Sequence, residues 1–297
     1  MHLGIDIGGT KTDAVVVDAD GAVRARRTLP SGRGAAAVIA AALEAARDAC
    51  AQVGVEPASL TIGIGTPGTV VDGVVSHALN LQVDRLDLAG AIEAALGARP
   101  TVDNDVNAAA LGAYLLAGGG DRSMAYLNLG TGLAAGLVLD GRLWRGSRGA
   151  AGEIGHVSVD PAGPIGSDGL PGGLETYASG AGLTLQWGVD GASGADVVAA
   201  AAAGDARARA ICDGAMFGLA SAVRVLVLTL DVDEVVVAGG MTAWGDELIG
   251  GARRLLDAWA ATSPFLASLD LAARMRPLEL EVPVAAIGAA MRGGGHG

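Results

Sequence analysis

The sequence is poor in cysteine, in aromatic residues and in positive charge. Its 297 residues include two cysteines, Cys50 and Cys212, and 3% Phe, Trp and Tyr. Two distant cysteines without a metal-type spacing argue against a disulfide framework and favour a reducing compartment. The 20 basic residues against 32 acidic ones give a formal net charge of −12. This charge argues against nucleic acid or an anionic membrane as a partner.

The sequence also lacks a visible targeting segment and a long uninterrupted apolar run. No basic n-region precedes Asp6, which interrupts the only apolar run near the N-terminus. The best candidate for a membrane span, residues 125–139, contains Asn128 and three glycines, and falls short of the ~18 apolar residues required. We therefore expect a cytoplasmic protein with no membrane partner. Apolar residues (51%) and 48 glycines are abundant and predict a folded chain with close backbone packing.

The order of apolar segments predicts an α/β fold. Short runs rich in Val, Ile and Leu indicate strands at 3–7, 14–17, 60–64, 69–75, 100–103, 125–129, 135–139 and 234–238. Helical patterns alternate with them at 35–51, 88–96, 106–116, 195–203, 205–230, 245–261 and 284–291. Interleaved strands and helices are typical of α/β proteins.

One internal repeat links the two halves of the chain. Ile5-Asp-Ile-Gly-Gly-Thr matches Leu127-Asn-Leu-Gly-Thr-Gly at an offset of 122 positions, and the apolar runs that follow match at the same offset. The repeat indicates either two glycine-rich hairpins that agree by chance, or two lobes of similar fold across a cleft. The glycine-rich stretch 117–121 would then mark the boundary between the lobes.

The two glycine turns suit an anionic ligand, because glycine lets backbone N–H groups approach phosphate oxygens. The candidate phosphate-binding residues are Gly8, Gly9, Thr10 and Lys11 in the first turn and Gly130, Thr131 and Gly132 in the second. Lys11 either adds a cation or is a solvated turn residue. Asp6 fits beside phosphates if a Mg²⁺ ion lies between them, bound through water. The plainer alternative is a tight hairpin in which Asp6 is solvated.

Two well-known nucleotide motifs do not explain these turns. The chain contains no GxxxxGK[ST] P-loop. It does contain GxGxxG at residues 63–68, but Pro67 leads into an extended segment instead of opening a helix. A dinucleotide site requires that helix, so we reject this interpretation.

Seven short motifs, in order from residue 3 to about 291, together resemble the ROK family of repressors and sugar kinases. They are DIGGTK, GIGTPG, DNDVNAAALG, LGTGLAAGLVLDG, GAAGEIGH, LETYASG and VVVAGGM. The resemblance implies an actin-like ATPase (RNase H-like) fold with two similar lobes around a central cleft. It assigns residues 1–117 plus about 281–297 to the N-terminal lobe and 118–280 to the C-terminal lobe. It also implies ATP-dependent phosphorylation of a hexose or N-acetylhexosamine, commonly at O6, and a homodimer.

The resemblance gives roles to two polar residues at a predicted strand end. Asn104 and Asp105 lie where a strand gives way to a helix, and both residue types are favoured N-caps, so the plainer interpretation is that Asp105 only caps Ala108. The resemblance places Asp105 as the general base that takes the proton of the attacking hydroxyl, and Asn104 on a neighbouring sugar hydroxyl. A carboxylate of ordinary basicity suffices, since phosphoryl transfer depends mainly on positioning and charge neutralisation.

The resemblance also implies sugar contacts from Glu153, His156 and Glu175. Their plainer interpretations are two solvated loop carboxylates and a partly buried histidine. Asn80 falls on a family asparagine near the substrate, although Leu79 replaces the usual proline. Gly239 and Gly240 resemble the family's nucleoside contact, and are otherwise an ordinary strand-to-helix turn.

The sequence departs from the family pattern between His156 and Glu175. Many members carry three cysteines there that join the histidine around a structural zinc ion. Their positions are occupied here by Gly166, Asp168 and Gly173. One histidine and one carboxylate do not make a tetrahedral zinc site, so we expect no zinc. Three prolines, at 161, 164 and 171, are expected to stiffen the loop instead.

Alternative functions remain open at this point. The chain is either an ATP-dependent kinase, a polyphosphate-dependent glucokinase, or a catalytically altered member of the family that binds sugar or has a regulatory role. A DNA-binding regulator is disfavoured, because the DIGGT motif starts at residue 6 without a preceding helix-turn-helix domain and the chain is acidic.

Overall fold

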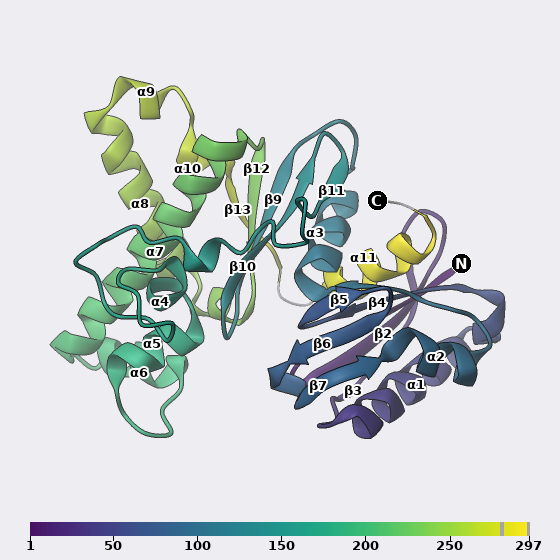
Figure 1. The fold of residues 1–297 in the computed structure, drawn as a ribbon. Helices are drawn as coiled ribbons and strands as arrows, with labels where there is room; N and C mark the ends of the chain where they lie inside the picture. Colours follow the sequence, from purple (N-terminus) through teal and green to yellow (C-terminus); the bar gives the residue numbers. More distant parts are fainter. Residues whose placement is uncertain (280–281, 296–297) are drawn as a thin grey trace. The chain divides into compact units, whose positions relative to one another are not determined.

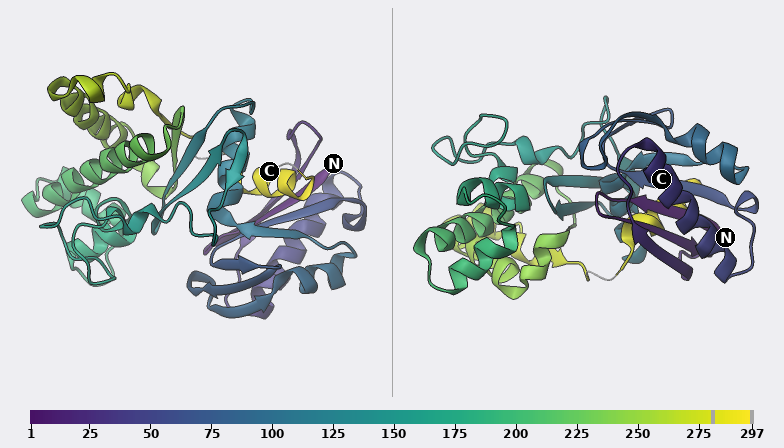
Figure 2. Two further views of the ribbon diagram at one scale, coloured as in Figure 1. Left: turned by 45° about the horizontal axis from the view of Figure 1, so that its top comes forward. Right: turned by 90° about the horizontal axis from the view of Figure 1, so that it is seen from below.

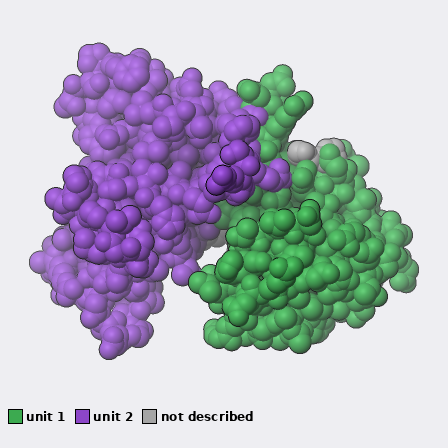
Figure 3. Space-filling view, in the orientation of Figure 1, with its two compact units in different colours: residues 1–121, 140–143, 282–297 green, residues 122–139, 144–281 purple. Residues whose placement is uncertain are grey.

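The computed structural model describes residues 1–279 and 282–295 (Figure 1). The predicted lobe boundary near residue 281 lies outside the described residues. The chain forms two compact units, coloured separately in Figure 3. Unit 1 comprises residues 1–121, 140–143 and 282–297, and unit 2 comprises residues 122–139 and 144–281.

Unit 1 is built on a sheet of five strands in the order β3-β2-β1-β4-β8. These strands are β1 (His2–Ile7), β2 (Lys11–Val17), β3 (Val23–Pro30), β4 (Thr61–Thr66) and β8 (Thr101–Asn104). β1, β4 and β8 run parallel, whereas β1, β2 and β3 form an antiparallel meander. A smaller antiparallel sheet contains β5 (Thr69–Val71), β6 (Val74–Ala78) and β7 (Val83–Asp87).

Helices cover both faces of the main sheet of unit 1. Leu3, Ile5 and Ile7 share a buried cluster with α1 (Ala35–Gln52) and α2 (Leu88–Leu96). The opposite face packs on α3 (Asp105–Leu116) and α11 (Val284–Gly293), and Figures 1 and 2 both show α11 against the sheet. Glycine makes this close approach possible, because a Cβ on Gly4 would lie 1.9 Å from the Ala286 carbonyl oxygen. Since side chains alternate along β1, Asp6 lies on the same face as Gly4 and points toward α3.

The second sheet repeats the strand order of the first, as β11-β10-β9-β12-β13. Its strands are β9 (Met124–Leu129), β10 (Leu133–Leu139), β11 (Arg142–Trp144), β12 (Glu234–Ala238) and β13 (Met275–Pro277). The predicted offset of 122 residues between the two repeats holds for β1 and β9, but it is one residue too long for the strands that follow the turns. Leu3 pairs with Val16, whereas Ala125 pairs with Leu137, which lies 121 positions after Val16. The second turn is therefore one residue shorter than the first.

Unit 2 contains most of the helical residues. The helices are α4 (Leu174–Ala178), α5 (Gly180–Trp187), α6 (Gly194–Ala202), α7 (Ala206–Leu230), α8 (Asp246–Thr262), α9 (Pro264–Ala267) and α10 (Leu271–Arg274). Short 3₁₀ turns are η1 (Pro57–Ser59) and η2 (Leu79–Leu81) in unit 1 and η3 (Ile154–His156) and η4 (Gly240–Trp244) in unit 2. Among the described residues, α7 is the one helix long and apolar enough to cross a membrane. Most of its apolar stretch is buried in the core of unit 2, as in the core helix of a globular domain.

Most predicted elements occur within one to four residues of their expected ends, and 234–238 and 88–96 match β12 and α2. The single strand predicted at 69–75 is wrong. The chain reverses there through Asp72 and Gly73, both at positive φ, to form β5 and β6. β3 was not predicted, because this edge strand carries three arginines on largely exposed positions and shows no clear alternation.

Candidate functional site

Two carboxylate residues meet at the carboxyl end of the parallel strands of unit 1. Asp6 is the second-last residue of β1 and pairs with Gly65 of β4, and Asp105 begins α3. A Cβ on Gly65 would lie 3.4 Å from Asp105 Cα and 3.8 Å from Asp6 Oδ1. Gly65 therefore lets the two acidic residues approach across the neighbouring strand. Both side chains are only partly exposed.

The electrostatics of this cluster favour a cation. Burial, and then the carboxylates of Asp105 and Asp13, raise the pKa of Asp6 to about 8, while Lys11 has a smaller opposing effect. Asp13 lies opposite Asp6 in the β1–β2 pair and is itself buried. Its carboxylate is bound by Arg26, whose Nε donates to Oδ1 at 3.0 Å. The remaining negative charge near Asp6 fits a hard divalent ion that prefers oxygen ligands, such as Mg²⁺. Within the described residues, no group of three or more His, Cys, Asp and Glu is arranged to hold a metal directly.

The first glycine turn lies beside this cluster. The Gly8 N–H donates to the Lys11 carbonyl at 2.9 Å, which closes the turn after β1. Thr10 and Lys11 are exposed. Asn80, in η2, lies directly over the turn, since a Cβ on Gly9 would be 3.2 Å from Asn80 Cβ. The structure therefore brings Asn80 next to the predicted phosphate-binding residues of unit 1.

Asn104 is the residue that caps α3. Its Oδ1 accepts from the backbone N–H of Val106 at 2.9 Å and of Asn107 at 3.3 Å. Asn104 is therefore the N-cap, and Asp105 is the first residue of α3, whose Oδ1 also accepts from the Val106 N–H at 2.9 Å. Asp105 occupies the first helical turn, where the helix dipole favours its charged form. The Asn104 amide group reaches the Gly68 carbonyl at 3.5 Å.

The second glycine turn is held by a helix N-terminus in unit 2. The Gly130 N–H donates to the Gly132 carbonyl at 3.0 Å. The N–H groups of Gly180 and Ala181, which open α5, donate to the carbonyls of Gly130 and Thr131 at 2.9 and 3.0 Å. These bonds occupy the turn's carbonyl groups and fix its conformation. Asn128 stands at the position that Asp6 holds in the first repeat.

Three predicted sugar-binding residues gather near the start of β10. Glu175 lies in the first turn of α4, and its Oε2 accepts from the Leu133 N–H at 2.9 Å. The 3₁₀ turn η3 lies beside it, because a Cβ on Gly155 would be 3.2 Å from Glu175 Cβ. Glu153 precedes η3 and His156 ends it, and both are exposed. The exposed position of Glu153 also agrees with its plainer interpretation as a solvated loop carboxylate. The plainer interpretation of His156 as a partly buried histidine does not hold, because its side chain is 65% exposed.

The loop that replaces the cysteine motif brings Asp168 to His156. Asp168 Oδ2 lies 3.5 Å from His156 Nδ1. Gly166 and Gly173 offer no ligand atoms in their side chains, so the residues present do not fit a tetrahedral zinc site. The loop is closed instead by isolated bridges between Ser158 and Gly173 and between Ile165 and Pro171.

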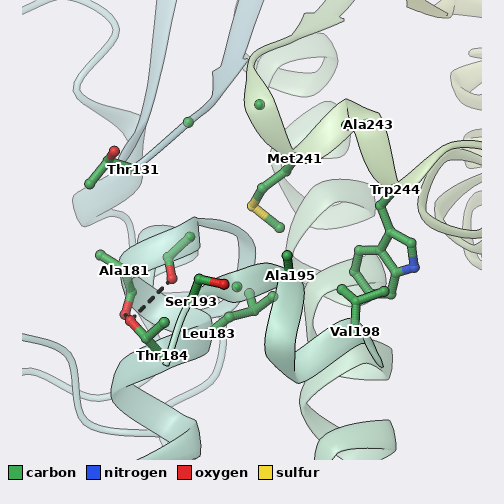
Figure 4. Close-up of a pocket in the computed structure, with 14 residues that line it drawn as sticks. Thr131, Ala181, Leu183, Thr184, Ser193, Ala195, Val198, Met241, Ala243 and Trp244 are labelled. Carbon is green, nitrogen blue, oxygen red and sulfur yellow. Dashed lines mark hydrogen bonds between the residues drawn. The ribbon is translucent and has the colours of Figure 1, made fainter. Parts of the chain in front are cut away.

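A cavity of about 780 Å³ opens beside the second glycine turn, entirely within unit 2. Figure 4 shows Thr131 on one side, Met241 and Trp244 of η4 on the other, and Ser193 and Ala195 at the start of α6 below. Gly240 lines this cavity, and Gly239 packs tightly on Leu129 at the end of β9. The lining residues are apolar, small or hydroxyl-bearing, and none is charged.

Sequence reasoning did not find several residues of these sites. Gly65 was read as part of a rejected motif, and Met241, Trp244 and Ser193 were not singled out. Trp244 could have been noticed because it comes shortly after the Gly239-Gly240 turn. Its role was otherwise hidden, since the cavity wall that it forms with α6 depends on packing between distant segments.

Comparisons with known proteins find the ROK family and sugar kinases. The model of the ROK family matches residues 2–290. A glucokinase of Streptomyces coelicolor is 38% identical over 189 residues, which cover 62% of this chain and 57% of the relative. The matched part thus spans a little over half the length of that relative. An N-acetylmannosamine kinase of Escherichia coli strain SMS-3-5 is 31% identical over 284 residues, covering 91% of this chain and 92% of the relative.

A solved structure extends the likeness to three dimensions. The ROK family glucokinase of Streptomyces griseus, in complex with glucose and AMPPNP, matches with a TM-score of 0.76 and 28% identity over 98% of both chains. These likenesses confirm the predicted α/β, actin-like ATPase fold.

Proposed function

Because the chain belongs to the ROK family, we propose that it is an ATP-dependent sugar kinase that phosphorylates a hydroxyl group, O6, of a hexose or N-acetylhexosamine. The observation that carries the proposal is the meeting of Asp6 and Asp105 across Gly65, beside a glycine turn. Two neighbouring carboxylates repel each other unless a cation or a proton lies between them, and a site for phosphoryl transfer supplies such a cation. Relatives named glucokinase and N-acetylmannosamine kinase support the reaction class.

In this proposal Asp105 is the general base. Its carboxylate accepts the proton of the attacking sugar hydroxyl and orients the oxygen toward the γ-phosphorus. Asp105 lies in the first turn of α3, where the helix dipole is favourable to a negative charge. A strongly raised basicity is unnecessary, since the transition state of phosphoryl transfer is loose and the proton leaves late.

The two glycine turns would hold the phosphates through backbone N–H groups, with the hydroxyls of Thr10 and Thr131 as further donors. Asp6 would hold Mg²⁺ through water, and the ion, when bound, neutralises charge on the transferring phosphoryl group. Lys11 adds a cation next to the first turn. The raised pKa of Asp6 in the absence of a metal agrees with a carboxylate whose ionised form needs a cation nearby.

The cavity of unit 2 favours a nucleoside over an inorganic polyphosphate. Its walls of Met241, Trp244 and small residues suit a planar base and a ribose. A polyphosphate chain would need cationic side chains along its path, and the cavity lining has none. We therefore propose ATP as the donor, with Gly239 and Gly240 lying under the nucleoside. The glucokinase with bound AMPPNP supports this choice.

Five polar residues are proposed to bind the sugar, namely Asn80, Asn104, Glu153, His156 and Glu175. Carboxylates can each accept hydrogen bonds from neighbouring hydroxyls, which gives a sugar its orientation. Glu175 already binds the Leu133 N–H through Oε2, so its Oε1 is the oxygen that we assign to the sugar. We further propose a cytoplasmic homodimer, for which light scattering should give twice the mass of the chain.

A coupled assay of ADP release tests the function directly. Glucose, mannose, fructose, N-acetylglucosamine and N-acetylmannosamine would be offered with ATP and, in parallel reactions, with polyphosphate followed by detection of the sugar phosphate. We expect ATP- and Mg²⁺-dependent turnover of at least one sugar. Sugar binding without turnover, or turnover with polyphosphate alone, would contradict the proposal.

A further inference from the structure

Side-chain and backbone hydrogen bonds close the loop at residues 157–173. Ser158 Oγ donates to the Pro171 carbonyl at 2.7 Å, and the Tyr177 hydroxyl donates to Asp160 Oδ2 at 2.8 Å. Burial, and then Asp160, raise the pKa of Tyr177 to about 12, so its hydroxyl remains a donor. These hydrogen bonds stabilise the base of the loop, and neither of them involves the His156 side chain.

Asp168 is held separately, at the tip of the loop. The Leu170 N–H donates to its Oδ1 at 3.0 Å, and the Gly166 N–H donates to the Leu170 carbonyl at 2.8 Å. The bond from Leu170 is the main cause that lowers the pKa of Asp168, with a smaller contribution from His156. Asp168 is therefore a carboxylate in a fixed turn, and its second oxygen, Oδ2, lies 3.5 Å from His156 Nδ1.

The exposure of the His156 and Asp168 side chains argues against a stabilising role for their contact and in favour of a positioning role. The side chains of His156 and Asp168 are 65% and 35% exposed. Pairs this accessible to water add little to folding stability. The contact between Asp168 and His156 is therefore not explained by a gain in stability, which leaves the orientation of the imidazole ring as the property that it can affect.

We propose that Asp168 is a positioning residue for sugar recognition by His156. This inference rests on the proposed sugar kinase function. Asp168 accepts the Nδ1 proton of the neutral ring, which leaves Nε2 as an acceptor for a sugar hydroxyl. The 3.5 Å contact is expected to shorten when the sugar is bound, since such bonds are often long in the free enzyme. The nearby carboxylates of Glu153 and Glu175 come from η3 and α4 and accept other hydroxyls.

The test compares Asp168→Asn with Asp160→Asn, a control that removes the loop-closing bond to Tyr177 and leaves Asp168 unchanged. For Asp168→Asn we expect the sugar KM to rise about tenfold, a difference of about 1.4 kcal/mol, with kcat, the KM for ATP and the melting temperature nearly unchanged. Asp160→Asn should mainly lower the melting temperature. In a His156→Gln background, Asp168→Asn should have no further effect on the sugar KM. An unchanged sugar KM in the single variant, or a full additional loss in the double variant, would overturn the proposal.

A spectroscopic measurement separates this inference from the function itself. The chain has four histidines, so His156→Gln assigns the ¹⁵N imidazole signals of His156 in the wild-type protein. A Nδ1-protonated ring is expected in wild type, with a shift toward a tautomer mixture in Asp168→Asn. If the wild type phosphorylates no sugar, the proposed function fails and this spectrum alone decides the pairing. Identical His156 signals in both proteins would refute the pairing, even in an active kinase.

Discussion

The two glycine turns share one scaffold but differ in their surroundings. Each follows the first strand of a five-stranded sheet with the same strand order. In unit 1 the second-last residue of the strand is Asp6, which lies next to Asp105 and Lys11. In unit 2 the matching residue is Asn128, and the turn after it lies next to an uncharged cavity and the N-terminus of α5. The first turn thus lies beside two further ionisable residues, Asp105 and Lys11, whereas the second faces an uncharged cavity and has the Glu175 carboxylate beside Gly132.

The difference shows how a duplicated scaffold can divide one task. Asparagine keeps the hydrogen-bonding shape of aspartate but has no charge. A second carboxylate at position 128 would face a turn whose carbonyl groups already point toward α5, and would add repulsion without a metal to offset it. We infer that unit 1 handles charge and proton transfer, and that unit 2 handles the nucleoside. The predictions below test this division.

The largest expected difference follows from exchanging the two polar residues. Asp6→Asn should lower kcat by about 10- to 100-fold and weaken the dependence on Mg²⁺, as for other groups that hold a metal through water. Asn128→Asp, the matched exchange in unit 2, should raise the KM for ATP with a smaller effect on kcat. Steady-state kinetics at several Mg²⁺ concentrations measure both. Equal losses from the two exchanges would contradict the division.

A second prediction concerns the nucleoside cavity. Trp244→Ala removes an apolar wall, so the KM for ATP should rise about tenfold while the sugar KM stays unchanged. Trp144→Ala, at an exposed tryptophan of β11 outside the cavity lining, is the control and should leave the KM for ATP unaltered. If both variants behave alike in the kinetic assay, the cavity is not the nucleoside site.

A third prediction concerns stability near the second turn. Gly239 has φ 97° and ψ 168°, a region that only glycine adopts easily, and a Cβ there would lie 2.5 Å from the Leu129 carbonyl oxygen. Gly239→Ala should therefore reduce the free energy of unfolding by about 1 to 3 kcal/mol. A Cβ on Gly240 meets no atom within 4 Å, so Gly240→Ala should be nearly neutral. Denaturant titration measures the free energy of unfolding of both variants. If Gly240→Ala is destabilised as much as Gly239→Ala, the explanation is wrong.

The smallest expected effect lies outside both turns. Hydrogen bonds from Arg24, and then from the Ala22 N–H, lower the pKa of Asp18 in the β2–β3 hairpin. The pKa of Asp18 in the folded protein lies below its unfolded value near 3.8. The ionised carboxylate therefore stabilises the protein above pH 3.8, and this stabilisation is lost as the pH falls through the folded pKa. Asp18→Asn should slightly lower the melting temperature at pH 7 and match wild type at a pH below the folded pKa. Asp20→Asn is the control, and neither variant should change kcat.

Much of the fold was predictable because strongly periodic segments keep their character in three dimensions. β12 and α2 are examples, with apolar runs and clear end signals. The 69–75 segment was not, since two turn residues at positive φ split a run that looks continuous in sequence. β3 was missed because an edge strand rich in arginine lacks the pattern of a buried strand.

The candidate site was predictable in part. Motif order singled out Asp6, Asp105 and the glycine turns, and in the structure Asp6 and Asp105 lie close together. The role of Gly65 was hidden, because its importance comes from what lies on either side of it. The contact between His156 and Asp168 was equally hidden. Eleven residues lie between them, and the sequence does not show how the loop folds back to bring the two side chains together.

The most direct test of the account is Asp105→Asn, which removes the proposed base but keeps a side chain of the same shape. Turnover by the coupled assay should fall by about 100-fold or more, while calorimetry should give a sugar affinity within a few-fold of wild type. A variant that turns over at a near-normal rate would remove Asp105 from its role and, with it, the proposed division between the two turns.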